Sequence, residues 1–413
     1  MNYSSSIIRG NGGPLLLLSM RRLSNLVAYS MLYEFEDIVT DITGADRIEV
    51  DNPEALEFSR RAYKLIRKAS GSATLAQKLA PPPSVIRLDR QYDLFFPVFN
   101  HPHELHALAA VPNWRDHCRV GICYINEVWV HLLPEYLLEQ LSRFDHIFLA
   151  MHHAVDAVAR ITGRPCSQLP LAADVARFSP WPAPLVRNID VCNVGRRSAL
   201  THEVLLRLGA DRRIFYYYDT YAGSADKDKR QRTFRVDQPA QHRLLMANVL
   251  QRSRYYIANR ARFNESGYPE IHQESSGRFY EGIAAGTVIL GSPPDTPEFR
   301  RQFNWPDAVI HIPSDHPGIE DTLNDLDREP ERLSRIHREN TRHAALRHDW
   351  VYRLEDVFRQ AGIAPTEGML RRKQLLQELG GQIIRAAPDI QRPAGSSVRL
   401  LRPSNSVPPA ALE

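Results

Sequence analysis

The segment with the clearest chemical content is EIHQESSGRFYEGIAAGTVILG, residues 270–291. Ser275 or Ser276 can cap a helix here, and the apolar run TVILG follows the helix as a buried strand. Helical spacing places Arg278 and Glu281 together on one face. A helix N-terminus binds phosphate, an arginine adds a planar pair of donors, and a glutamate can accept two ribose hydroxyls. These residues therefore suit a nucleoside diphosphate.

The opposite face of this helix is apolar and packs on a sheet. Phe279, Gly282 and Ile283 fall on that face, the helix runs to Ala285, and Gly286 can take the left-handed conformation that ends it. The same pattern also occurs in an ordinary capped helix that binds no ligand. The arginine and the glutamate would then form an exposed ion pair between neighbouring turns. The spacing leaves both interpretations open.

A second candidate phosphate contact is the sequence GRR, Gly195–Arg197. It follows the apolar run IDVCNV and precedes a predicted helix, which is where ligands bind in doubly wound sheets. The glycine lets the backbone approach a phosphate closely, and Arg196 or Arg197 could stabilise a departing diphosphate. The alternative is a basic turn that faces solvent.

Polar residues also follow three apolar runs in the first half of the chain. They are Asn100, His101 and His103 after YDLFFPVF, Asn126 and Glu127 after VGICYI, and His152 and His153 after HIFLAM. A general base that works near neutral pH is a histidine or a carboxylate with a raised pKa, so Glu127, His101 and His152 are the candidate catalytic residues. For each of them, a structural polar residue at a strand end is the alternative. No carboxylate or cysteine completes a metal-ligand set around His101, His103 and His106, so we expect no metal.

Short apolar strands alternate with helices along the chain, which predicts an α/β fold with parallel sheets covered on both faces. A proline-rich stretch at residues 169–184 interrupts the pattern, which then restarts, so we place a domain boundary there. The predicted organisation is a flexible leader at 1–13, an N-terminal domain at 14–178, a C-terminal domain at 187–350, C-terminal helices at 351–387 and a disordered tail at 388–413.

Three segments between about Leu169 and Gly291 resemble GT-B fold glycosyltransferases, in particular the group-1-like families (glycosyl transferases group 1, CgeB-like). RFYEGIAAGTVILG is similar to their nucleotide-binding segment, and IDVCNVGRRS to the first strand and loop of their donor domain. LPLAADVARFSP resembles the stretch that passes between their domains, with Asp174, Phe178 and Pro180 in matching places. The resemblance implies two Rossmann-like domains with parallel sheets facing across a cleft, and C-terminal helices that cross back to the first domain.

The resemblance also implies roles for individual residues. The first domain would bind the acceptor and the second the nucleotide-sugar donor, with Glu281 on the ribose. Many retaining members carry another glutamate eight positions earlier, where this chain has Gln273, with Glu274 one position away. The stereochemical outcome therefore stays open. These enzymes need no bound metal for the chemistry and no cofactor besides the donor.

Composition limits the alternatives. The 413 residues carry a net charge of +4, too small an excess for a charge-driven nucleic-acid binder. The four cysteines form no CxxC pair, and no apolar run is long enough to cross a bilayer, so we expect a cytoplasmic protein with peripheral membrane contact at most. The expected partners are a nucleotide sugar and a glycan, lipid or protein hydroxyl acceptor. A nucleotide-sugar epimerase or hydrolase, and a non-catalytic nucleotide-sugar binding protein, are the alternatives.

Overall fold

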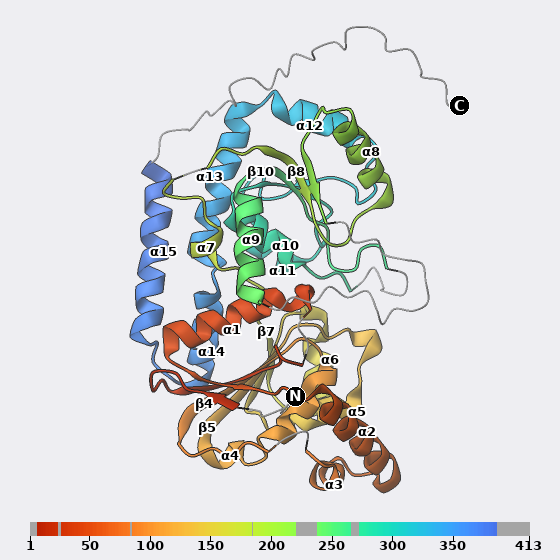
Figure 1. The fold of residues 1–413 in the computed structure, drawn as a ribbon, viewed down its shortest axis with the longest axis vertical. Coiled ribbons are helices and arrows are strands. Elements are labelled where there is room, and N and C mark those ends of the chain that lie inside the picture. The colour runs from red at the N-terminus through yellow and green to blue at the C-terminus, as the bar shows by residue number, and fades with distance from the viewer. Residues whose placement is uncertain are drawn as a thin grey trace, which may run out of the picture.

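The computed structural model describes residues 6–23, 26–82, 85–183, 185–219, 238–265 and 272–385. Within these ranges the chain forms two α/β domains, each built on one sheet (Figure 1). The first sheet has the strand order β1-β3-β2-β4-β5-β6-β7, and the second has the order β12-β11-β10-β8-β9. All neighbouring strands pair in parallel except β1 and β3. The predicted α/β fold of two Rossmann-like domains is confirmed.

The strands of the first domain are β1 (Ser6–Ile8), β2 (Leu15–Ser19), β3 (Asp46–Glu49), β4 (Tyr92–Phe99), β5 (Cys118–Ile125), β6 (His146–Leu149) and β7 (Cys166–Gln168). Its α-helices are α1 (Ser30–Thr43), α2 (Pro53–Ser70), α3 (Ala73–Leu79), α4 (Trp114–His117), α5 (Glu135–Leu138) and α6 (Val155–Thr162). Its short 3-10 helices are η1 (Val27–Tyr29), η2 (Pro102–Ala110), η3 (Val130–Leu132), η4 (Glu139–Arg143) and η5 (His152–Ala154).

The strands of the second domain are β8 (Ile189–Asn193), β9 (Tyr216–Tyr218), β10 (Ser253–Ile257), β11 (Val288–Gly291) and β12 (Ile310–His311). Helix α7 (Val175–Phe178) lies between the sheets in sequence. The later helices are α8 (Ala199–Ala210), α9 (Pro239–Gln251), α10 (Gly277–Ala284), α11 (Pro297–Gln302), α12 (Ile319–Asp327), α13 (Pro330–Arg347), α14 (Trp350–Ala361) and α15 (Glu367–Arg385).

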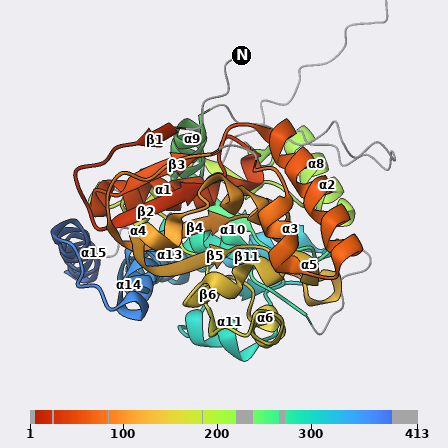
Figure 2. The same ribbon diagram turned by 90° about the horizontal axis from the view of Figure 1, so that it is seen from below.

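The run LLLLS forms β2, near the middle of the first sheet (Figure 2). Leu15 and Leu17 belong to one hydrophobic core, and Leu16 and Leu18 belong to another. Successive side chains of a strand point to opposite faces, so both faces of this sheet are covered. That double burial explains why the strand is continuously apolar.

The prediction of a flexible leader at residues 1–13 is wrong from Ser6 onward. Residues Ser6–Ile8 form β1, which pairs antiparallel with β3 at the edge of the first sheet. Arg9 then forms ion pairs with Asp46 at 2.8 Å and with Asp89 at 2.6 Å. Backbone pairing and these ion pairs hold a segment whose polar, glycine-bearing composition suggests a loose chain.

The chain crosses between the domains twice. The first sheet ends at Gln168 and the second begins at Ile189, on either side of the predicted boundary. After the second sheet, α14 packs on α1 and β5, and α15 runs alongside α13 and α1 (Figure 1). Trp350 at the start of α14 stacks on Phe35 of α1 with ring centroids 4.5 Å apart. The predicted return of the C-terminal helices to the first domain is confirmed, whereas the predicted tail at 388–413 lies outside the described residues.

Helices α13 and α14 are separated by a short break. The break falls at Asp349, whose side chain accepts a hydrogen bond from the backbone N–H of Val351 at 2.9 Å and so caps α14. Among the helices of the described ranges, none combines the length and apolarity that a membrane crossing demands.

Candidate functional site

The carboxyl ends of strands from both sheets face each other at the domain interface. Three pairs of side chains cross it at these strand ends: Glu127 with Arg262, His153 with Glu274, and His152 with Glu298. The first-domain partners follow β5 and β6, and the second-domain partners follow β10, precede α10 or lie on α11. Two of the three candidate catalytic residues, Glu127 and His152, are therefore brought to the second domain.

Arg278 occupies the first turn of α10, and its side chain contacts the loop between β8 and α8. Its guanidinium donates to the carbonyl oxygens of Arg196 at 3.0 Å, Val194 at 3.3 Å and Asn259 at 3.4 Å. Burial lowers its pKa, and no carboxylate of the described ranges lies within ion-pair distance of it. The exposed ion pair with Glu281 is therefore not formed. A partly buried guanidinium without an acid partner is a group that an anionic ligand would neutralise.

The GRR loop is in direct contact with this guanidinium through the carbonyl oxygen of Arg196. Gly195 has a φ of 78°, which a residue with a side chain rarely adopts, and its N–H donates to Asp219 at 3.0 Å. Arg197 forms an ion pair with the same Asp219, and Arg196 forms one with Glu265. The structure therefore brings Arg196, Arg197 and Arg278 together at the ends of β8 and β10, as the resemblance implies.

A chain of alternating charges joins this loop to the first domain. Glu127 accepts hydrogen bonds from Trp129 Nε1 at 2.8 Å and from Arg262 Nε at 2.6 Å. Arg262 also donates to Glu265 at 2.7 Å, and Glu265 pairs with Arg196. Arg262 has a φ of 53°, a conformation that side chains rarely adopt and that clusters at functional sites. Glu127 and Arg196 thus lie at the two ends of one network.

The second crossing contact joins His153 and Glu274. His153 Nδ1 donates to Glu274 at 2.7 Å, and His153 Nε2 accepts the backbone N–H of Val130 at 3.4 Å. Both side chains are nearly buried. His152, by contrast, is half exposed and lies 3.5 Å from Glu298. Both histidines thus have an acid partner, but His153 is the more buried and has contacts at both ring nitrogens.

The two candidate serines, Ser275 and Ser276, directly precede α10. Ser276 is the N-cap residue, as predicted, but its hydroxyl donates to the carbonyl oxygen of Asn259 at 2.9 Å and does not cap the helix. The Ser275 hydroxyl lies 3.5 Å from that of Tyr280. Gly286 has a φ of 65°, which confirms the predicted left-handed stop.

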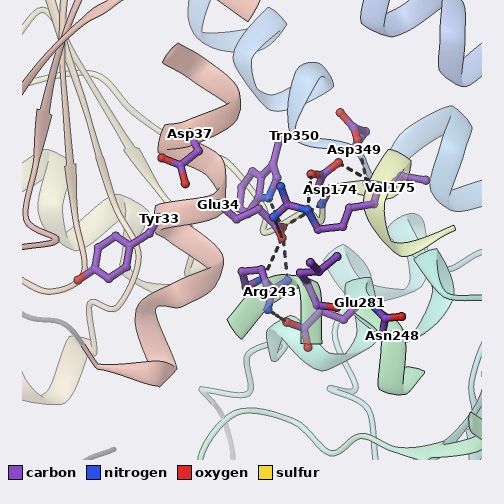
Figure 3. Close-up of polar contacts among 12 residues, drawn as sticks. Tyr33, Glu34, Asp37, Asp174, Val175, Arg243, Asn248, Glu281, Asp349 and Trp350 are labelled. Atoms are coloured by element: carbon purple, nitrogen blue, oxygen red, sulfur yellow. Dashed lines mark hydrogen bonds and ion pairs between the residues drawn. The ribbon is translucent and has the colours of Figure 1, made fainter. Parts of the chain in front are cut away.

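Glu281 is buried between the domains (Figure 3). One of its oxygens, Oε1, pairs with Arg243 of α9, whose Nε donates to Glu34 of α1 at 2.8 Å. We call Glu34, Arg243 and Glu281 the interdomain ion-pair cluster. Burial alone would lower the pKa of Arg243, and the two carboxylates raise it above its ordinary value. The other oxygen, Oε2, has no hydrogen-bond partner among the described residues.

Residues between β7 and β8, where the chain first passes from one domain to the other, also contact this cluster. The backbone N–H of Asp174 donates to Glu34 at 3.0 Å, and the guanidinium of Arg243 lies 4.8 Å from the Phe178 ring centroid. Arg372 of α15 bridges Asp174 and Asp349 at 2.7 Å each. Asp174 and Phe178, two residues that carry the family resemblance, therefore hold the domains together.

His101 follows β4 in a buried part of the first domain. Burial, together with the neighbouring His103, lowers the pKa of His101 to about 4. Its neighbour Glu104 accepts hydrogen bonds from Asn100 N at 2.7 Å and Nδ2 at 2.9 Å, and burial raises its pKa to about 8. Burial likewise raises the pKa of Glu36 in α1 to about 7. At neutral pH this side of the interface holds ionisable groups that burial drives toward their uncharged forms.

The histidines at 101, 103 and 106 do not gather around one point. His106 packs edge-on against Tyr63 with ring centroids 4.9 Å apart, away from the other two. Within the ranges that the structure describes, no group of three or more His, Cys, Asp or Glu is arranged to hold a metal ion.

Residues 219–359 match a family model described as glycosyl transferase-like. The matched segment contains β10, β11 and β12 of the second domain and continues into α14. The match includes Arg243, Arg278 and Glu281, and it supports the resemblance to GT-B glycosyltransferases that the sequence motifs indicate. No curated protein matches the chain in sequence.

Several solved structures share part of the fold. TarM of S. aureus has 10% sequence identity over 65% of this chain and 54% of that chain, with a TM-score of 0.41. A glycosylation-associated protein complex (Gap123) from Streptococcus agalactiae has 13% identity over 68% and 54%, with a TM-score of 0.32. Accessory secretory protein 1, 2 and 3 of Streptococcus pneumoniae has 10% identity over 78% and 58%, with a TM-score of 0.29. The chain thus spans little more than half the length of the solved chains it matches.

Two site residues of the second domain, Arg243 and Arg262, were not among the sequence candidates. Arg243 and Arg262 belong to segments without a motif, and only the tertiary structure brings them to Glu281 and Glu127. Glu274, adjacent to the expected position, is the acid that crosses the interface. Gln273 instead accepts the backbone N–H of Asp295 at 2.8 Å. The sequence signal for Glu274 was its place one residue after Gln273, the position at which many retaining family members carry a glutamate.

Proposed function

We propose that this protein transfers a sugar from a nucleoside-diphosphate sugar to a hydroxyl acceptor. The second domain holds the donor, and its diphosphate lies against the GRR loop, Arg278 and the N-terminus of α10. The first domain presents the acceptor hydroxyl. The glycosyl transferase-like family match supports the class of reaction.

The observation that carries this proposal is the state of Arg278. Its partly buried guanidinium donates to three loop carbonyls and has no acid partner among the described residues, at the strand ends where α/β folds bind ligands. A diphosphate supplies the missing negative charge. Charge grows on the diphosphate as the glycosidic bond breaks, so a preorganised cation here stabilises the transition state more than the bound donor.

Other residues take supporting roles in the proposal. Oxygen Oε2 of Glu281, which Arg243 leaves without a partner, accepts one ribose hydroxyl, so the ribose contact uses one oxygen and not two. Arg196 or Arg197 exchanges its carboxylate for donor phosphate. Glu127, His101 and His152 stay the candidates for the acceptor side, and His153 with Glu274 joins them.

The proposal includes a reaction without a bound metal or a cofactor other than the donor, in a cytoplasmic protein. The acceptor is a hydroxyl of a glycan, a lipid or a protein. Activity in the presence of a chelator tests the metal component directly, since a metal-dependent transferase loses its turnover when the ion is removed.

The decisive experiment is a calorimetric binding screen against UDP-, GDP-, ADP- and CDP-sugars, followed by product analysis with and without added hydroxyl acceptors. We expect one nucleotide class to bind, and Arg278→Met to lose that binding. Arg328→Met is the matched control because Arg328 pairs with Asp325 on the surface of the same domain.

The outcomes separate the competing functions. Glycosylated acceptor supports a transferase, whereas free sugar or an epimerised donor in the absence of acceptor identifies a hydrolase or epimerase. Donor binding without any turnover identifies a binding protein. If no nucleotide sugar binds, the donor-site assignment is wrong.

A further inference from the structure

Helices α2 and α3 carry large apolar side chains on their outward surface. Phe58 and Leu65 of α2, and Leu75 and Leu79 of α3, are between 42% and 70% exposed. The two helices pack on each other and lie side by side at the far end of the first domain from the second (Figures 1 and 2). Such side chains, gathered on one surface, mark an interaction site more often than scattered ones do.

The inner surface of α2 is already satisfied by the first domain. Tyr63 is buried, its hydroxyl donates to the carbonyl oxygen of Tyr136 at 3.0 Å, and its ring packs on His106. Arg67 forms an ion pair with Glu139 at 3.0 Å. The helix is therefore anchored, and its outward apolar side chains need a partner from outside the described fold.

The outward surface of α2 alternates apolar and cationic side chains. Phe58, Arg61, Leu65 and Lys68 follow one another at spacings of three and four residues, so they form a single stripe along the helix. Across residues 53–79, six Lys or Arg stand against two Glu, a local net charge of +4 that equals the net charge of the whole chain. This hairpin therefore carries a local excess of positive charge.

The three lysines of this hairpin have no carboxylate partner among the described residues. These are Lys64, Lys68 and Lys78, whereas Arg61 pairs with Glu57 at 2.8 Å. Helix α15 offers a contrast, because Lys373 pairs with Glu355 and Arg372 with Asp349. On α2 and α3 the unpaired lysines thus stand beside the exposed apolar side chains Leu65 and Leu79.

We propose that the outward face of α2 and α3, which we call the α2–α3 face, docks the first domain on an anionic lipid surface. Bulky apolar side chains insert at the headgroup boundary while long lysines extend to lipid phosphates, the pattern of helices that lie in a membrane interface. A protein partner fits less well, since lysine is depleted from protein–protein interface cores. Helix α2 also contacts η2, so docking brings the loop that follows His101 close to the lipid. The proposal does not depend on the glycosyl-transfer function.

Vesicle co-sedimentation of the full chain tests this proposal. We expect binding to vesicles of phosphatidylcholine with phosphatidylglycerol, and little binding to phosphatidylcholine alone. Phe58→Ser with Leu65→Ser should weaken binding about 100-fold, at about tenfold for each side chain. Lys64→Glu, Lys68→Glu and Lys78→Glu together should also weaken it by at least about 100-fold, since each lysine contributes about fivefold.

Two matched variants complete the design. Leu244→Ser with Leu245→Ser changes two side chains of α9 that are 55% and 57% exposed, and it should bind vesicles like the wild type. Leu370→Ser with Leu375→Ser makes the same change on α15, where both are 54% exposed, and should also bind normally. Circular dichroism melts verify that each variant is folded.

Four results would overturn the proposal. The first is no binding to anionic vesicles, and the second is binding that Phe58→Ser with Leu65→Ser leaves intact. The third is binding lost in the α15 variant, which assigns the contact to α15. Self-association that disappears in Phe58→Ser with Leu65→Ser, without vesicle binding, would identify a second copy of the chain as the partner and also overturn it. Nucleotide-sugar turnover does not enter any of these outcomes.

Discussion

The two sides of the domain interface hold ionisable residues in opposite electrostatic states. On the second domain, Arg196, Arg197 and Arg278 present fixed positive charge at the ends of β8 and β10. On the first domain, burial pushes His101 and Glu104 in opposite directions, to pKa values of about 4 and about 8. Both of these groups are then uncharged near neutral pH. The second-domain side therefore presents arginines, and the region around His101 on the first domain holds uncharged groups.

This difference follows from what surrounds each group. Arginine keeps its charge even when buried, so a buried arginine attracts an anion or binds carbonyl oxygens, as Arg278 does. A buried glutamate with only amide donors, such as Glu104, takes up a proton instead. The contrast agrees with the proposed division between a charged diphosphate donor and an uncharged hydroxyl acceptor. The interdomain ion-pair cluster holds the two sides against each other.

The largest expected effect comes from breaking that cluster. Arg243→Met leaves Glu34 and Glu281 buried without their cation, which should cost about 3 to 5 kcal/mol of unfolding free energy. Urea denaturation measures this loss. Arg254→Met is the control, because Arg254 also pairs with two aspartates, at 3.0 and 2.5 Å, but at a more exposed position, where a salt bridge contributes about 1 kcal/mol or less. Equal losses in the two variants would show that the cluster does not hold the domains.

The second effect concerns the cationic side. Arg278→Met should weaken nucleoside-diphosphate binding about 100-fold, because a charge-assisted hydrogen bond to phosphate is lost. The affinity of Arg278→Lys should lie between those of the wild type and Arg278→Met, because lysine keeps the positive charge but lacks the planar pair of donors. Isothermal calorimetry gives the affinities. If Arg278→Met lowers the unfolding free energy but leaves the nucleotide affinity unchanged, Arg278 has a structural role like that of Arg243 and does not bind the donor.

The third effect is the pH dependence of stability that Glu104 contributes in the first domain. The pKa of Glu104 rises from 4.5 to about 8 on folding, so the folded state binds more protons than the unfolded state between these values. Its contribution to stability is therefore complete below about pH 4.5 and is lost as the pH rises toward 8. Glu104→Gln imitates the neutral acid and should remove roughly 2 kcal/mol of that decline.

Denaturation at pH 5 and at pH 8 measures the slope for both proteins. Glu36, whose pKa is raised to about 7, remains in the variant and keeps a residual slope of the same sign. If wild type and Glu104→Gln lose the same stability between these pH values, Glu104 is ionised in the folded protein and the contrast between the two sides fails.

The smallest effect separates the two roles of Glu281. Glu281→Gln keeps the size of the side chain, weakens the pair with Arg243 and removes the charge near the ribose. Donor affinity should fall about tenfold, together with a modest loss of stability. Glu339→Gln, a surface position paired with Arg342, is the control. A loss of stability with unchanged affinity would restrict Glu281 to the interdomain ion-pair cluster.

Much of the second domain could be predicted because its signals are local. The run TVILG and the glycine at 286 indicate a strand and a helix stop from neighbouring residues alone, and both occur. The GRR loop and Arg278 lie where the strand–helix pattern puts them. The edge strand at Ser6–Ile8 was missed because its stability comes from β3, a partner some 40 residues away, and not from its own composition.

The sequence by itself determined the alternation of strands and helices and the family resemblance of the segment at 278–291, since each depends on residues within a few turns of one another. Only the tertiary structure decided which charges meet. Arg243 lies between Glu34 and Glu281, and His153 against Glu274, across separations of 38 to 209 residues. Such pairings depend on how two domains pack, and burial then sets whether each group keeps its charge.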